Sequence, residues 1–187
     1  MVHALEAYIS KDASPFSDAM AEKALELIGK NIRRYVADRT DIEAAEAMIT
    51  GSLFAGIAFS WARLGDVHAM SHPVSAYFDV PHGVANAILL PTIVEYNALA
   101  DRGKYLKLFN YISLTPASEA EFESVMLVDL LTELNEQLGI PGSLGEVGVT
   151  ADKFDAMADD AMKSGNIAVN PRSTTKKDVL SLYEKAL

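Results

Sequence analysis

The chain has 187 residues and half of them are apolar, which allows one domain with a sizeable buried core. Its formal net charge of −10 argues against a nucleic-acid-binding protein, which usually carries a basic face, and against binding to an anionic membrane surface. The absence of cysteine excludes disulfides and thiolate metal sites. The first residues do not combine a basic region with an apolar one, so we expect no signal peptide and a cytoplasmic protein.

Apolar residues recur at helical spacing along most of the chain, and no stretch alternates strictly over the length of a strand. The sequence therefore predicts an all-α protein, with residues 1–187 forming a single helical domain. No internal repeat, low-complexity segment or linker divides it. The expected helices cover residues 2–9, 15–36, 41–64, 66–78, 84–100, 104–112, 118–139, 150–162 and 176–186.

Capping signals place two of the helix starts in the second half of the chain. Ser118 with Glu121 is a capping-box pattern, so a helix is expected to begin there. Gly139 followed by Pro141 predicts the end of that helix, because glycine closes a helix and proline cannot continue one. Thr150 is the expected cap of the next helix.

Residues 47–62 form an uncharged stretch long enough to raise the question of a membrane span. A span needs about 20 mostly apolar residues, and this stretch is shorter and contains Thr50, Ser52 and Ser60. We therefore expect a central helix that is buried on all sides, and no contact with a membrane.

Three of the four histidines fall in one segment, residues 64–91. His68 and His72 are four positions apart and so share one face of a helix, which Pro73 is expected to kink or to restart. His82 lies in a turn-like Pro-His-Gly before an apolar helix, where the helix N-terminus disfavours a protonated ring. Neutral imidazoles are common metal ligands, so these residues are candidate ligands; the alternative is that they are ordinary core or surface histidines.

Motifs of other enzyme classes are absent. No HExxH, zinc-deaminase or Rossmann pattern occurs, and the loop with Gly142, Gly145 and Gly148 is expected to be a connector. Asp66 lies two positions before His68, and we expect it to be a solvent-facing helix cap or a hydrogen-bond partner of that ring.

The stretch GDVHAMSHPVSAYFDVPHGVANAILLP closely resembles the signature of the iron-containing (group III) alcohol dehydrogenases. Similarity extends to HALEAYIS and ASPFSDAMAEKALELI near the start, and to GIPGSLGEVGVTADKF and Asn170-Pro171-Arg172 near the end. The resemblance implies the all-helical C-terminal domain of the dehydroquinate-synthase-like architecture.

The same resemblance implies roles for the histidines. His3, His68 and His82 match metal ligands, and His72 matches an active-site histidine that assists proton transfer. The metal would be Fe(II) or Zn(II), which polarises the oxygen of a small alcohol or aldehyde while NAD(P) exchanges hydride with its carbon.

Two departures from the family pattern stand out. The family's aspartate ligand lies four residues before the position of His3, and the nucleotide-binding domain is not in this sequence. We therefore expect about half an enzyme, inactive alone, whose exposed apolar helix faces favour a homo-oligomer. Ser75 also stands where the family often has glycine.

Two alternatives stay open. The chain could be a non-enzymatic helical metal-binding or assembly module, or a relative similar to zinc glycerol dehydrogenase. The spacing from His68 through His72 to His82 favours the iron-containing branch over that relative.

Overall fold

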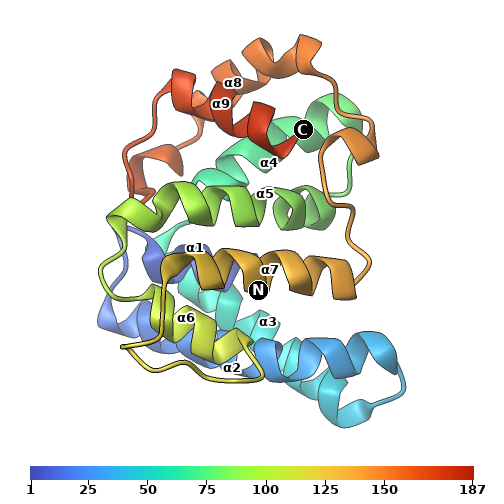
Figure 1. Ribbon diagram of the computed structural model, residues 1–187, viewed down its shortest axis with the longest axis vertical. Helices are drawn as coiled ribbons and strands as arrows, with labels where there is room; N and C mark the ends of the chain where they lie inside the picture. The colour runs from blue at the N-terminus through green and yellow to red at the C-terminus, as the bar shows by residue number, and fades with distance from the viewer.

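The computed structural model describes all 187 residues and contains nine α-helices, four 3-10 turns and no strand. The all-α prediction is thus confirmed (Figure 1). The α-helices are α1 (Val2–Ile9), α2 (Pro15–Ala37), α3 (Ile42–Ala62), α4 (Asp66–Phe78), α5 (His82–Asn97), α6 (Tyr105–Ile112), α7 (Ser124–Gln137), α8 (Phe154–Lys163) and α9 (Lys176–Ala186).

The helices stack in layers along the long axis of the molecule (Figure 1). α2 and α3 pack side by side at one end, and α1 lies against both. α5 and α7 pack together in the middle, with α6 between α7 and α2. α8 and α9 cover the other end, where α8 packs on α4. A cluster of 38 buried apolar residues runs through these layers, so α1, α4 and α5 are held by a continuous core.

The segment after α6 differs from the expected helix over residues 118–139. The capping-box bonds do form, because Glu121 accepts from the backbone and the hydroxyl of Ser118 at 3.1 and 2.5 Å, but they close only a turn. The side chain of Asn110 bonds both backbone groups of Ala117 and holds this segment as a loop. α7 therefore begins later, at Ser124.

The expected cap at Thr150 is also displaced. Its hydroxyl bonds the carboxylate of Asp152 at 2.5 Å, and the 3-10 turn Ala151–Lys153 precedes α8, which starts at Phe154. Pro73 was expected to kink or restart the helix that carries His68 and His72. α4 continues through this buried proline as one α-helix, so no new helix starts there.

The prediction that the helix of residues 47–62 is buried on all sides is wrong. Ile49, Leu53 and Trp61 on α3 are 72%, 63% and 68% exposed. Only its small residues are buried against the neighbouring helices: Ala44, Gly51, Ala55, Ala58 and Ala62. By length and composition α3 could cross a membrane, and 22% of its most apolar window is buried in this fold. The sequence shows the apolar character of this helix but not which of its faces has a neighbour.

Candidate metal centre

Three histidines from three helices meet at one point. His3 lies in the first turn of α1, His68 in the first turn of α4, and His82 is the first residue of α5. One ring nitrogen from each lies within 4.8 Å of the other two. The Nε2 atoms of His3 and His68 are 3.1 Å apart. The three residues predicted as ligands are thus neighbours in space.

The turn between α4 and α5 positions His82 beside His68. Asp79 ends α4 with a left-handed backbone, φ 54°, and Pro81 precedes the first residue of α5. The chain therefore reverses, α5 packs against α4, and the rings of His68 and His82 lie 5.2 Å apart between centroids.

Asn86 lies one turn after His82 and touches two of these rings. Its Nδ2 is 2.9 Å from Nε2 of His82 and 3.2 Å from Nε2 of His68. An amide NH₂ donates and does not accept, so in this orientation the amide nitrogen of Asn86 faces a lone pair on each Nε2 atom. The sequence interpretation missed Asn86; its i+4 spacing from His82 was the available signal.

Glu6 lies one turn after His3 on α1 and is only 3% exposed. Its Oε1 accepts from the backbone N–H of Val67 at 2.7 Å, and its Oε2 pairs with Nδ1 of His68. The sequence interpretation missed this residue too. A single acid among the apolar residues of α1 was the only signal.

His72 lies near the three histidines but outside the group whose nitrogens converge. Its ring stacks on that of His82, with centroids 5.2 Å apart and planes at 21°, and its centroid is 6.0 Å from that of His68. Both His72 and His82 belong to the exposed side of the site, so this side is open to a reacting molecule.

The environment favours the neutral form of His3, His72 and His82. Burial, reinforced by the neighbouring His68, lowers the pKa of His3 to about 4. Burial followed by the proximity of His68 also lowers the pKa of His72 and of His82. Neutral imidazoles keep a lone pair available for a cation near pH 7.

The donor set fits a divalent transition metal. Such ions bind imidazole nitrogen at about 2.0–2.1 Å, so two ligands of a tetrahedral site lie roughly 3.3 Å apart. The 3.1 Å between the Nε2 atoms of His3 and His68 is close to this spacing, and a ring nitrogen of His82 lies within 4.8 Å of a nitrogen of each. Three imidazole nitrogens with one carboxylate behind them form a reasonable site for a 2+ ion.

Asp66 is neither a solvent-facing cap nor a partner of His68. It is fully buried, and its Oδ2 accepts from the hydroxyl of Thr174 at 2.5 Å. Burial raises the pKa of Asp66 to about 7. Its backbone N–H donates to Asn170, which exchanges two amide bonds with Asn97. This polar network ties the start of α4 to the segment before α9.

Known proteins are similar to this chain in both sequence and fold. The model of a family described as "Fe-containing alcohol dehydrogenase family, C-terminal" matches residues 1–187. The 1,3-propanediol dehydrogenase of Citrobacter freundii is 39% identical over the whole chain, and the lactaldehyde reductase of Escherichia coli is 38% identical. A crystal structure of a 1,3-propanediol oxidoreductase superposes on all of this chain with a TM-score of 0.94 at 38% identity.

The chain spans about half the length of these relatives: 48% of each of the two curated enzymes and 49% of the solved structure. The match covers the three converging histidines and every helix described above. The chain therefore belongs to the Fe-containing alcohol dehydrogenase family and corresponds to its C-terminal part.

Proposed function

We propose that this chain is the metal-binding half of an NAD(P)-dependent alcohol dehydrogenase that interconverts a small alcohol and its aldehyde. The observation that carries this proposal is the convergence of three imidazole nitrogens within 4.8 Å of one another. It is supported by the family match over residues 1–187. That match also favours the iron-containing branch over a relative similar to zinc glycerol dehydrogenase.

In this proposal His3, His68 and His82 hold the metal. When bound, the ion acts as a Lewis acid toward the substrate oxygen, while NAD(P) exchanges hydride with the carbon. Fe(II) is the ion favoured by the family. Zn(II) suits the same three imidazoles, and the usual order of affinities places it above Fe(II) at a neutral nitrogen site.

His72 is proposed to move the proton of the reaction. His72 reaches solvent, but partial burial and then the proximity of His68 lower its pKa, so it is a neutral base near pH 7. Stacking on His82 orients the His72 ring beside this proposed ligand. His72 itself is not proposed to bind the metal. A proton accepted there can pass directly to water.

The carbon chain of the substrate is proposed to lie in an open, largely apolar hollow beside His3. The hollow is lined by Met1, His3, Ile28, Met48, Ser52, Ala55, Gly56 and Phe59. The ring of Phe59 lies 4.9 Å from that of His3 between centroids. Such a lining suits a short hydrocarbon chain, in keeping with the three-carbon substrates named for two of the relatives.

The other half of the enzyme is proposed to supply the nucleotide site. We also propose that the 187 residues self-associate when prepared alone, because Phe16 stacks edge-on against Trp61 at 5.5 Å and both are exposed. Sedimentation velocity checks this part, and a clean monomer at high concentration would contradict it.

The metal site is tested by titrating the chelator-treated chain with Zn(II) against a chromophoric competitor, and with Fe(II) under argon. We expect one ion per chain, no binding in His68→Ala or His82→Ala, and nearly full binding in His72→Ala. An equal loss in all three variants would make His72 a ligand. Metal binding without alcohol oxidation in the complete protein would favour the alternative, a non-enzymatic metal-binding module.

A further inference from the structure

Glu6 is a buried carboxylate with an unusual set of partners. It is 3% exposed, and its only ion-pair partner is His68, since no Lys or Arg lies within reach. Burying a charge is costly unless the charge is paired and hydrogen-bonded. Both oxygens of Glu6 are used in this way, one by the Val67 N–H and one by the His68 ring.

The contact with Glu6 determines which nitrogen of His68 carries the proton. A neutral imidazole has one N–H and one lone pair. Because the carboxylate can only accept, the proton lies on Nδ1, and the lone pair of Nε2 points toward His3 and Asn86. The same carboxylate is bound to the backbone of Val67, so the ring is fixed relative to its own helix.

The local packing leaves room for this carboxylate. A Cβ at Gly65 would lie 3.0 Å from Oε1 of Glu6 and 2.9 Å from Oδ1 of Asn170. A larger residue at this position would therefore displace one or both side chains. Glu6 thus projects from α1 against Gly65, Val67 and His68 at the start of α4.

We propose that Glu6 is a positioning residue of the metal centre: it holds His68 in the Nδ1–H tautomer and adds the negative charge that the three imidazoles lack. A carboxylate behind a histidine ligand makes that ligand more basic and fixes its ring, and losing such a partner weakens metal binding about 10–100-fold. The inference rests on the proposed metal-binding role of the three histidines.

The test compares Glu6→Gln with Asp66→Asn. Asp66 is the matched control because it is a buried carboxylate in the same turn as His68 but bonds Thr174 and not the ring. Zn(II) is the probe, with affinity measured against a chromophoric chelator. We expect the Kd of Glu6→Gln to rise about 10–100-fold and that of Asp66→Asn to stay within about threefold of the parent chain. Equal losses in the two variants, or none in Glu6→Gln, would overturn the inference.

A second measurement reads the proton position without any metal. In the apo chain with ¹⁵N-labelled histidine, NMR shifts distinguish the two tautomers of His68. We expect Nδ1–H in the parent chain and a mixed or inverted population in Glu6→Gln, whose amide can donate to Nδ1. An unchanged tautomer in Glu6→Gln would overturn the inference, whether or not the parent chain binds Zn(II). A parent chain that binds no Zn(II) would by itself refute only the proposed metal site.

If Glu6→Gln does not fold, Gly65→Ala takes its place. The added Cβ encroaches on Oε1 of Glu6 without removing its charge. Weaker Zn(II) binding together with a change in the His68 tautomer is expected, and unchanged values of both would contradict the proposal.

Discussion

The Nε2 atoms of His3 and His68 lie 3.1 Å apart although the two residues are 65 positions apart in the chain. Two imidazole nitrogens at this distance share a proton or a cation, because two facing lone pairs would repel each other. A metal at this point would cross-link α1 to α4 and α5, so its presence should be measurable as stability of the whole fold.

The first prediction concerns metal addition and removal. An ion that binds only the folded chain stabilises it by about 2.7 kcal/mol at a concentration a hundred times its Kd. We expect Zn(II) to raise the melting temperature of the 187-residue chain and EDTA to reverse the change, as followed by circular dichroism. His82→Ala should show neither effect; a similar rise in that variant would place the ion elsewhere.

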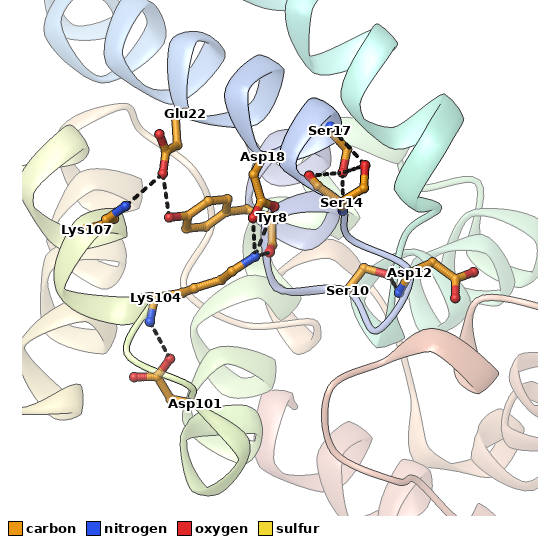
Figure 2. Close-up of polar contacts among 10 residues, drawn as sticks. All are labelled: Tyr8, Ser10, Asp12, Ser14, Ser17, Asp18, Glu22, Asp101, Lys104 and Lys107. Atoms are coloured by element: carbon orange, nitrogen blue, oxygen red, sulfur yellow. Dashed lines mark hydrogen bonds and ion pairs between the residues drawn. The ribbon is translucent and has the colours of Figure 1, made fainter.

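The second prediction concerns a polar cluster that holds α1 in place (Figure 2). The hydroxyl of the buried Tyr8 donates to Glu22 at 2.6 Å, and Lys104 lies over the Tyr8 ring at 4.2 Å. Tyr8→Phe should lower the free energy of unfolding by about 1–2 kcal/mol, since a hydrogen bond to a charged group is lost. Urea unfolding measures this. Tyr35→Phe is the control, because no hydrogen bond of that hydroxyl is present, and a loss as large there would refute the argument.

The third prediction follows from the pKa of Glu22. Burial by itself raises that pKa, but hydrogen bonds from Tyr8 and Lys107 outweigh burial and leave it lowered. A carboxyl whose pKa is lower when folded adds stability above its unfolded pKa of about 4.5, and this stability is lost as the pH falls through the folded value. Glu22→Gln should thus destabilise the chain more at pH 7 than near pH 3. Urea midpoints at both pH values check this, and an equal effect at both would contradict it.

The fourth prediction contrasts two helical glycines. A Cβ at Gly29 on α2 would lie 2.2 Å from the backbone oxygen of Tyr111, whereas a Cβ at Gly56 on α3 meets nothing within 4 Å. Gly29→Ala should therefore force α2 and α6 apart and cost about 1–3 kcal/mol. Gly56→Ala should stabilise α3 by up to about 1 kcal/mol through helix propensity. Thermal unfolding of both variants measures the contrast, and a stable Gly29→Ala would mean that the two helices can separate freely.

The fifth prediction concerns activity. The side of the site with His72 and His82 is exposed, and positioning of cofactor and substrate accounts for much of an enzyme's rate. We expect the 187 residues alone to reduce neither NAD nor NADP with small alcohols, as followed by absorbance. His82→Ala, purified in parallel, measures contaminating host dehydrogenase. Turnover in the parent chain that is absent from this variant would refute the prediction.

Most of the helices could be predicted from the sequence because apolar periodicity is a local signal. The cap patterns at Ser118 and Thr150 were less reliable, since α7 and α8 begin later at Ser124 and Phe154. The same locality explains why part of the site could be found: the i, i+4 spacing of His68 and His72 and the turn before His82 are both patterns of neighbouring residues. Glu6 and Asn86 were not found, since their partners lie on another helix or one turn away and neither residue type is diagnostic of a metal centre. The burial of α3 was mispredicted for a related reason: composition does not reveal which faces meet a neighbour.

α1 has only eight residues, yet its two faces contact different helices. His3 and Glu6, one turn apart, face the histidines of α4 and α5, while Tyr8 faces α2 and Lys104 (Figure 2). A residue inserted or deleted between positions 3 and 8 would rotate one face by about 100° relative to the other. The spacing between His3 and Tyr8 is therefore fixed by two sets of contacts at once, and a change in it would separate the contacts of Tyr8 from the histidine cluster.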